Sequence, residues 1–583
     1  MTIEISFLIK MFVFLLIFVF IHFVGAHESK SLQILHELNT DFGMELNVFV
    51  DFGNLESLYL LKNLDTPRIQ LTSQSAESWD FQIRGIFTER SLVLVRLGDS
   101  GLDPRVASLL PHLVDKVHEL HFVFLSMQEP LFPKDDLYTY CYKQGFVNVL
   151  LIGAGIMYSY LPYPYIQPIK LSNISEYLNR ERIIRNFRGF PIRTLRSTLA
   201  PRDFEYLNDR NELVRGGYLF AAVKEFANRY NATLDSVIMP NVTEYAAYVA
   251  VEEMLIAKRI DIVCYFRALS WNVAYTAPLS IIAEYLMIPQ VRPISSFLYY
   301  SRPFSWSLWV VVALTVLYGS LMLYLSSGRA RNEIGECLLY SFSHILYSCH
   351  QAIRIGGWRD TVIHVILTIA GFILTNVYLA TLSSILTSGL FEKEYNTFED
   401  LSNAPYPNLH DEFYRMELQS KTFLPESFRQ KSITLNITLL TAYRDGLNKN
   451  YIYLLYEDRL ELVLMQQYLL KTPRFYKLRQ EVGYALESYC VSNSLPYLKM
   501  TSEFMRRLQE HGINIKFKAD AFRELIQLGM YTLMRDDEPP TKAFDLQYYY
   551  FAFGLWAVGL VLALLVLSIE LVKWRYHKTR ARK

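Results

Sequence analysis

The 583-residue chain has few cysteines, almost no net charge and no common catalytic motif. Five cysteines are too few for a disulfide-stapled fold, and no Cys-x-x-Cys pair or Cys/His cluster indicates a metal site. A net charge of +1 lacks the basic excess of nucleic-acid-binding proteins. Gly-x-Ser-x-Gly, His-Glu-x-x-His and Walker patterns are absent, and HELH at residues 118–121 lacks the zinc-helix spacing. We therefore expect no enzyme, no cofactor or metal, and no nucleic-acid partner.

The most informative feature is a set of three long apolar runs, at residues 305–325, 361–390 and 546–569. Each exceeds the roughly 20 residues that an α-helix needs to cross a bilayer. None contains Asp, Glu, Lys or Arg, and the second holds a single histidine, His364. A shorter apolar piece at residues 337–349 lies between the first two runs and is too short to cross. This layout predicts three transmembrane helices with a re-entrant loop within residues 327–360.

The chain begins with a segment that is typical of a secretory signal, residues 1–26. Lys10 precedes an apolar run, and Val24, Gly25 and Ala26 supply the small residues of a cleavage site. An uncleaved anchor is the alternative, because the apolar run could extend to Val24. Either interpretation places the following segment outside the cytosol.

Basic residues beside the apolar runs predict the orientation. One group follows the third run: Lys573, Arg575, Lys578, Arg580, Arg582 and Lys583. A second group lies between the first two runs: Arg329, Arg331, Arg354 and Arg359. Basic residues mark the cytoplasmic side of a membrane protein. With three crossings, the chain before residue 304 and residues 391–545 are expected outside the cell, and the tail at residues 573–583 inside.

Glycosylation sequons agree with this orientation. They begin at Asn173, Asn231, Asn241 and Asn436. All four lie in segments that the basic residues place outside, where N-glycosylation occurs. We expect a multi-pass plasma-membrane glycoprotein with an extracellular N-terminus and a cytoplasmic C-terminus.

Residues 27–185 predict an extracellular α/β amino-terminal domain. Strand-like runs occur at residues 46–50, 92–95, 120–125 and 147–152. A helix-like stretch at residues 104–118 separates two of them, and such alternation favours α/β layers.

Two further segments show the patterns of α/β lobes. In residues 186–303, helical spacing of Leu219, Val223, Phe226 and Tyr230 precedes expected elements at residues 237–239 (strand), 243–258 (helix), 260–266 (strand) and 285–288 (strand). In residues 391–545, we expect a strand at residues 451–456, mixed helix and turn at residues 472–489, and a helix at residues 502–511. Gly512 stands where that helix needs a left-handed residue.

The second apolar run carries a recognisable sequence motif. Tyr378, Ala380, Leu382, Leu386 and Thr387 fit SYTANLAAFLT, with Thr381 where Asn is usual and Ser383-Ser384 in place of Ala-Ala. Residues 398–401 match a motif at the entry to the second lobe segment, and residues 510–513 match a motif in the stretch before the last apolar run. On these residues, the chain from residue 186 to its end resembles the ionotropic glutamate receptor superfamily, specifically its divergent insect chemosensory branch, the ionotropic receptors.

The resemblance implies a multi-domain membrane protein. Its parts would be the amino-terminal domain, a split periplasmic-binding-protein-like α/β ligand-binding domain, and an α-helical ion-channel domain. Lobe 1 would comprise residues 186–303, lobe 2 residues 391–545, and the three transmembrane helices residues 304–326, 361–390 and 546–572.

The resemblance also implies a function. The chain would be a subunit of a ligand-gated, non-selective cation channel and a taste, odorant or pheromone receptor, located in the dendrite of a sensory neuron. Its partners would be a small-molecule ligand, permeant cations, membrane lipid and co-receptor subunits of a hetero-tetramer. The alternative is a non-conducting ligand-binding or tuning subunit that depends on a co-receptor. A transporter is disfavoured by three crossings without an inverted repeat.

The ligand-binding residues of the family are only partly present. Relatives that bind glutamate clamp its carboxylate with an arginine. The equivalent stretch here has only Arg267, which either faces the cleft or is a solvated or interface arginine. The family's acidic group falls near Tyr456, Glu457 or Asp458, with Glu457 the closest candidate and a surface carboxylate the alternative. Glutamate and glycine are therefore not expected as ligands.

By the same resemblance, Tyr378, Ala380, Thr381 and Ser384 are candidate gate residues. Thr381 and Ser384 could instead be small residues that allow helix packing. For the apex of the pore loop the candidates are Tyr347, Ser348, His350 and Gln351, and Gln351 is our choice.

Overall fold

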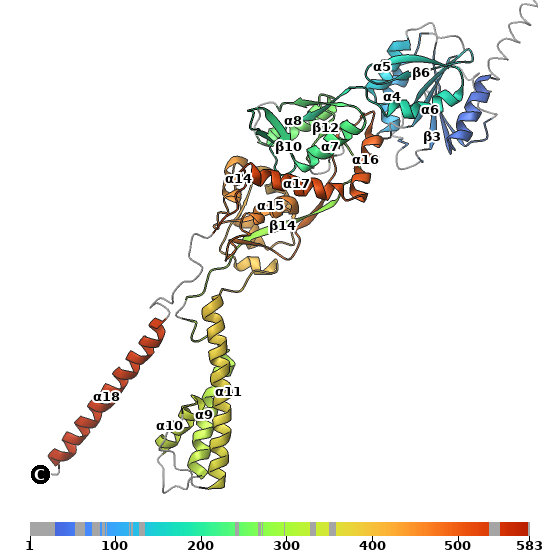
Figure 1. Cartoon of the computed structure of the whole chain (residues 1–583). Coiled ribbons are helices and arrows are strands. Elements are labelled where there is room, and N and C mark those ends of the chain that lie inside the picture. The colour runs from blue at the N-terminus through green and yellow to red at the C-terminus, as the bar shows by residue number, and fades with distance from the viewer. Residues whose placement is uncertain are drawn as a thin grey trace, which may run out of the picture. The chain divides into compact units, whose positions relative to one another are not determined.

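The computed structural model describes most of the chain. The described residues are 30–52, 64–72, 82–83, 88, 90–98, 100–115, 117, 120–126, 134–239, 244–265, 270, 272–295, 298–326, 334–348, 357–535 and 549–580. Two compact units share the chain: Met1–Ile288 with Thr397–Arg535, and Pro289–Asn396 with Asp536–Lys583 (Figure 1).

The first unit begins with a seven-stranded sheet, the amino-terminal domain. Its strand order is β2 (Arg68–Leu71), β1 (Leu46–Val50), β3 (Ser91–Arg96), β4 (His121–Ser126), β5 (Val149–Gly153), β6 (Ile156–Leu161) and β7 (Gln167–Leu171). Strands β1 to β5 pair in parallel, and β6 and β7 are antiparallel. Alternate residues of β3 enter two different core clusters, Val93 one and Leu94 the other. Burial of both faces explains why the parallel strands have nearly continuous apolar sequences.

The helices of this domain are α4 (Pro104–Val114), α5 (Lys134–Lys143) and α6 (Ile174–Ile184), together with helical residues 30–41. The α/β prediction for this region is confirmed. The expected strands at residues 46–50, 92–95, 120–125 and 147–152 correspond to β1, β3, β4 and β5. Helix α4 ends earlier than expected, with Asp115 as its C-terminal cap.

Lobe 1 is a five-stranded sheet with its helices. The order is β11 (Thr233–Val237), β8 (Pro191–Leu195), β12 (Ile262–Val263), β20 (Cys490–Val491) and β13 (Ala274–Tyr275). A hairpin of β9 (Phe204–Leu207) and β10 (Leu213–Gly216) and four helices complete the lobe: α7 (Tyr218–Arg229), α8 (Glu244–Ile256), α16 (Leu498–Glu510) and α17 (Ile513–Gln527). Helix α7 places Leu219, Val223 and Phe226 in the core, as their spacing predicts.

Lobe 2 is a six-stranded sheet with its helices. The main path is β16 (Ile433–Thr434), β15 (Asn408–His410), β17 (Ile452–Tyr456), β14 (Ile281–Pro289) and β18 (Phe475–Lys477), and β19 (Gly483–Leu486) also pairs with β14. Its helices are η3 (Glu399–Asn403), α12 (Glu412–Ser420), α13 (Glu426–Gln430), α14 (Ile437–Asp445) and α15 (Glu457–Met465).

The two lobes exchange strands. β14 comes from the chain before α9 but lies inside the sheet of lobe 2, and β20 comes from the chain after α11 but lies inside lobe 1. The predicted division at residues 186–303 and 391–545 therefore describes two segments of sequence rather than two separate sheets. Sequence patterns missed the exchange because strand partners are chosen by tertiary pairing.

Two local expectations need correction. The strand expected at residues 237–239 is β11, at Thr233–Val237, whose polar edge position masks its pattern. Residues 472–489, expected to mix helix and turn, contain β18 and β19, whose pairing with β14 decides their conformation. Gly512 is left-handed as predicted, with φ of 67°.

Among its described residues, the second unit contains three helices that are long and apolar enough to cross a membrane: α9 (Trp306–Ser326), α11 (Trp358–Ser388) and, within α18 (Tyr550–Arg580), residues Tyr550–Arg575. These confirm the three predicted spans as candidates. Helix α10 (Ile334–Ile345) is shorter and packs with α9 and α11 around Leu323, Cys337 and Leu367. The segments that enter and leave this bundle pair with each other, because Ile294 N donates to Leu390 O at 2.8 Å.

Candidate functional site

The chain crosses between the two lobes through two adjacent segments, residues 276–280 and 487–489. Leu279 N donates to the Glu487 carbonyl at 2.8 Å, and Glu487 N donates to the Ser280 carbonyl at 2.9 Å. Paired crossings of this kind commonly serve as hinges between domains, and residues 276–280 and 487–489 are called the hinge below.

A buried ion pair joins the lobes next to this hinge. Arg202 lies in lobe 1 between β8 and β9, and Asp458 lies in lobe 2 in the first turn of α15. Arg202 Nε donates to Asp458 Oδ2 at 2.7 Å, and Nη2 donates to Oδ1 at 2.9 Å. Both side chains are buried. The pair has the planar, bidentate geometry of strong arginine–carboxylate contacts, and the helix dipole of α15 favours the carboxylate.

The backbone of lobe 1 fixes the position of Arg202. Its carbonyl accepts hydrogen bonds from Leu219 N at 3.1 Å and Phe220 N at 3.3 Å, in the first turn of α7. Gly217 precedes α7 with φ of 110°, and a Cβ there would stand 2.4 Å from the Arg202 oxygen. Only glycine combines this conformation with this approach.

Tyr218 links the ion pair to the hinge. Its hydroxyl lies 3.0 Å from Asp458 Oδ2 and also makes a hydrogen bond with Glu487. Ser280 Oγ donates to Glu487 Oε2 at 2.6 Å. One buried network therefore includes residues from lobe 1, lobe 2 and both crossing segments, so its hydrogen bonds depend on how the lobes meet.

The two carboxyl groups of this network differ in their pKa. Burial raises the pKa of Asp458, but the Arg202 charge and its hydrogen bonds outweigh burial and hold the pKa below its ordinary value. Burial raises the pKa of Glu487 above its ordinary value, although hydrogen bonds from Ser280 and Tyr218 oppose this. Asp458 is therefore the charged partner and Glu487 the group that protonates more easily.

A second arginine reinforces the contact between the lobes. Arg459 of α15 donates to the carbonyl of Ala200 in lobe 1 from Nε at 3.0 Å and Nη2 at 2.7 Å. Burial, followed by the charges of Arg444 and Arg202, lowers the pKa of Arg459 to about 10.

The predicted ligand-binding residue Glu457 lies next to this network but is not part of it. Glu457 has a partly exposed carboxylate whose Oε1 is 3.4 Å from Lys477 Nζ. Its neighbour Asp458, which the sequence left as an alternative, is the carboxylate at the junction. Tyr456, the third alternative, places its ring centroid 5.3 Å from the Arg202 guanidinium. Arg267 lies outside the described residues.

The candidate gate residues lie together on α11. Tyr378 donates from its hydroxyl to the Tyr300 carbonyl at 3.0 Å. Thr381 Oγ1 donates to Val377 O at 2.8 Å, and Ser384 O accepts from the hydroxyl of Ser388, so both hydrogen bonds stay within the helix. Ala380 and Ser384 are exposed in the single chain, and their role as a gate stays a prediction. Gln351 lies outside the described residues.

The membrane-type helices contain a buried polar chain that no motif indicated. His344 Nε2 of α10 lies 2.8 Å from His364 Nδ1 of α11, and His344 Nδ1 lies 3.1 Å from Thr368 Oγ1. The other ring nitrogen of His364 is 3.7 Å from Asp360 Oδ1. Gly371 permits the close contact of the helices, because a Cβ there would stand 1.9 Å from the His344 carbonyl oxygen. Ionisable residues within apolar helices commonly have a functional role.

Three of the four sequon asparagines lie within the described residues, and all three are exposed. Asn173 accepts from Glu176 N at 3.0 Å, and Asn436 caps α14 by accepting from Thr438 N at 2.8 Å. Asn231 has a left-handed backbone, with φ of 55°. Asn241 lies outside the described residues. Glycosylation of these sites stays a prediction.

No sequence pattern marked Arg202, Tyr218 or Glu487 as site residues. The one usable hint was the Gly216-Gly217 pair before α7, since consecutive glycines at a helix start indicate a close backbone approach. No protein-family model matches the chain, and no curated protein matches it.

Proposed function

We propose that this protein is a subunit of a ligand-gated cation channel of the ionotropic-receptor type and a chemosensory receptor in the plasma membrane. The observation that supports this best is the position of α9, α10 and α11 in the chain. They are inserted between β14 and β15, two strands of the same sheet that are separated only by β17. A membrane bundle inserted into one lobe of a hinged pair suits a device that converts lobe motion into helix motion.

The linkers supply a physical route for this conversion. Glu392 N donates to Arg292 O at 3.1 Å, and Ile294 N donates to Leu390 O at 2.8 Å. A displacement of lobe 2 would therefore pull on the start of α9 and the end of α11 together. In this proposal α11 moves at Thr381 and Ser384, which form the gate.

A small extracellular molecule would act at the junction of the lobes. Asp458 already satisfies Arg202 when the lobes are in contact, so a ligand works by changing the free energy of this contact relative to the separated lobes. The candidate contact residues are Arg202, Tyr218 and Asp458.

The same ion pair favours a second candidate function, a non-conducting tuning subunit. Residues of the chain itself hold the junction closed, and such a subunit would contribute a fixed lobe conformation to a hetero-tetramer whose co-receptors form the pore.

Whole-cell recording separates the two candidates. The chain is expressed alone and with candidate co-receptor subunits, and currents are recorded while small molecules are applied. A ligand-evoked cation current that Thr381→Glu abolishes, and the matched Thr361→Glu at the start of α11 preserves, supports the channel with its gate at Thr381. A current that persists in Thr381→Glu contradicts the gate assignment. A current that is the same in cells with and without the chain contradicts both candidates.

Topology is tested by cysteine labelling in intact cells with a membrane-impermeant reagent. Tyr468, on lobe 2, is 82% exposed. Tyr468→Cys should react in intact cells, whereas Lys578→Cys, in the predicted tail beyond the candidate span, should react only after permeabilisation. Reaction of Tyr468→Cys only after permeabilisation would overturn the receptor proposal.

A further inference from the structure

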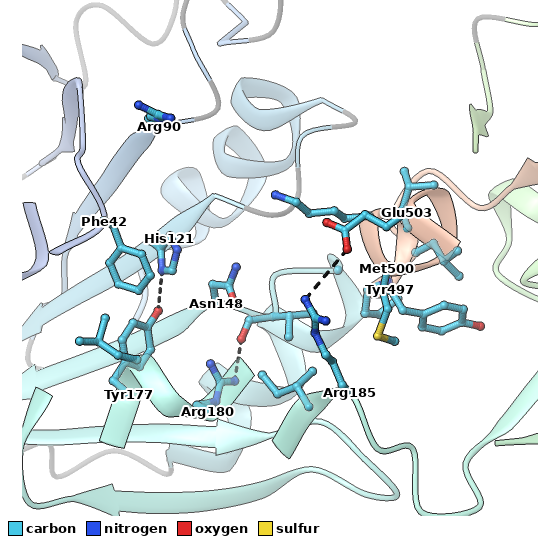
Figure 2. A pocket seen from close by; sticks show the side chains of 18 of the residues that line it. Phe42, Arg90, His121, Asn148, Tyr177, Arg180, Arg185, Tyr497, Met500 and Glu503 are labelled. Atoms are coloured by element: carbon cyan, nitrogen blue, oxygen red, sulfur yellow. Dashed lines mark hydrogen bonds and ion pairs between the residues drawn. The ribbon is translucent and has the colours of Figure 1, made fainter. Parts of the chain in front are cut away.

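A cavity of about 320 Å³ lies where the amino-terminal domain meets the start of α16 in lobe 1 (Figure 2). Its walls include Phe42, His121 and Tyr177 on one side and Tyr497, Met500 and Glu503 on the other. The volume lies at the lower end of the range of small-molecule sites. The cavity is separate from the network around Arg202 and Asp458.

Arg180 is a buried cation in the wall of this cavity, with only 2% of the residue exposed. Its Nε donates to Tyr160 O at 2.9 Å, and Nη2 donates to Val147 O at 2.7 Å. These partners are neutral carbonyls, and among the described residues no carboxylate pairs with Arg180. A buried charge without a counter-charge is costly, so an anion in the cavity would be favoured.

Other groups make the cavity basic. Arg90, Arg185 and Lys499 line it together with Arg180, and Glu503 is the single carboxylate among the described lining residues. Two carboxylates offset part of this charge: Glu503 Oε2 is 4.0 Å from Arg185 Nη2, and Glu45, outside the lining, places its Oε1 3.6 Å from Arg90 Nη1. Burial, then the charges of Arg180 and Lys499, lowers the pKa of His121 to about 4, so this histidine is neutral near pH 7.

One wall is aromatic, and it adjoins Arg180, whose guanidinium lies 5.8 Å from the Tyr177 ring centroid. The ring centroids of Phe42 and His121 are 4.1 Å apart, and those of Phe42 and Tyr177 are 6.3 Å apart. His121 Nδ1 lies 3.0 Å from the Tyr177 hydroxyl, which holds both rings in place. Leu178 and Ile184 add apolar surface, and Met500 adds apolar surface from the side of α16. An apolar body would fit against this wall while its charged group faces the arginines.

We propose that this cavity binds a small organic acid that consists of one anionic group and an aromatic or branched apolar body. The anion contacts the basic residues, and the body packs on Phe42 and Tyr177. Because the walls come from the amino-terminal domain and from α16, the bound acid strengthens the contact between the two. This inference does not depend on the proposed channel function.

The test uses the full chain in detergent, with phenylacetate as the probe and calorimetry as the measurement. Phenylacetamide lacks the charge, and acetate lacks the apolar body. We expect saturable binding of phenylacetate, at least tenfold tighter than of either control, since a charge-assisted hydrogen bond alone commonly contributes that factor. No saturable binding of phenylacetate, or equal binding of phenylacetamide, would overturn the proposal.

Variants locate the site. Lys499→Glu should weaken phenylacetate binding at least tenfold, whereas Lys516→Glu, an exposed lysine on α17 outside the cavity, should not. Phe42→Ala should weaken phenylacetate more than it weakens acetate. Far-ultraviolet circular dichroism confirms that each variant is folded. Binding unchanged in folded Lys499→Glu and Phe42→Ala would place the probe elsewhere and refute the assignment.

Discussion

The junction of the lobes and the membrane-type helices bury ionisable groups in different ways. At the junction, Arg202 and Asp458 meet as a bidentate pair from two lobes. In the helices, His344 and His364 meet through imidazole nitrogens, and Asp360 stands four residues before His364 on the same helix. The first arrangement uses full charges, and the second uses mainly hydrogen bonds.

Because of this difference, the two pairs of residues respond to different structural changes. Arg202 and Asp458 pair only when the two lobes touch, so their free energy depends on the opening of the hinge. His344 and His364 pair whenever α10 packs on α11, so their hydrogen bond depends on assembly of the bundle. Buried cysteines provide a local probe of each region: Cys264 and Cys490 in lobe 1 and Cys337 in α10. Their labelling rates measure the free energy of local opening.

The largest effect is expected from Asp458→Ala. It leaves the Arg202 charge buried without its partner, which typically costs about 3–5 kcal/mol. Labelling of Cys264 and Cys490 should accelerate by more than roughly a hundredfold, because each 1.4 kcal/mol is tenfold. Labelling of Cys337 should not change.

Two controls sharpen this test. Glu457→Ala removes the neighbouring, partly exposed carboxylate and should change the labelling rates little, as is usual for surface ion pairs. The double variant Arg202→Met, Asp458→Leu should restore most of the stability that Asp458→Ala loses, since apolar replacement of a buried ion pair is often neutral. Equal effects of Asp458→Ala and Glu457→Ala would show that the pair does not stabilise the junction.

The next effect concerns the helices. Gly371→Ala should destabilise the contact of α10 with α11 by about 2–3 kcal/mol, because its Cβ would overlap the His344 carbonyl. Mass spectrometry should find faster labelling of Cys337 and unchanged labelling of Cys490.

Gly335→Ala on α10 is the matched control, because a Cβ at Gly335 meets nothing within 4 Å. Alanine is a better helix former than glycine, so this variant should be neutral or stabilising. Acceleration of Cys337 labelling by both variants would refute the role of the close approach at Gly371.

A smaller effect, about 2 kcal/mol, is expected from Gly217→Ala. The substitution combines an unfavourable φ with a collision against the Arg202 carbonyl. Gly189→Ala shares the positive φ, of 84°, but its Cβ meets nothing within 4 Å. The loss of stability in Gly217→Ala minus the loss in Gly189→Ala, both measured from Cys490 labelling, gives the contribution of the collision. No excess would mean that Arg202 can shift without loss.

The smallest effect is a dependence on pH. The folded pKa of Glu487 is raised, so the folded state keeps a proton that the unfolded state loses above about pH 4.5. Its contribution to stability is therefore present at lower pH and is lost as pH rises through the folded pKa, by at most about 1.4 kcal/mol per pH unit. Glu487→Gln should remove this loss.

Asp458 should act in the opposite direction. Its folded pKa is lowered, so its contribution is present above about pH 3.8 and is lost as pH falls through the folded pKa. Labelling of Cys490, normalised at each pH to the denatured chain, measures both slopes. If Glu487→Gln still loses stability as pH rises, the loss belongs to another titratable group.

The sequence predicted the parts of the fold that depend on local patterns. The apolar runs indicated α9, α11 and α18, and the β-branched and aromatic runs indicated β1, β3, β4 and β5. These signals arise from burial on one or both faces of an element and need no knowledge of its partner.

The junction could not be predicted in the same way. Arg202 and Asp458 are separated by most of the two-lobed region, and nothing near either residue marks it as buried. Glu457 and Asp458 are adjacent carboxylates, and only the first turn of α15 decides which one faces lobe 1. The resemblance predicted an acidic residue in this turn, and the packing of the turn places Asp458 rather than Glu457 at the junction.

The strand exchange has a consequence for biosynthesis. β14 is made before α9 and α11, but its partner β17 is made after them, and β20 completes the sheet of lobe 1 later still. Neither sheet can be completed until the later strand of each pair, β17 or β20, has been synthesised. The edges of β14 therefore stay unpaired until then. The sheet of either lobe can therefore be completed only after α9, α10 and α11 have been synthesised.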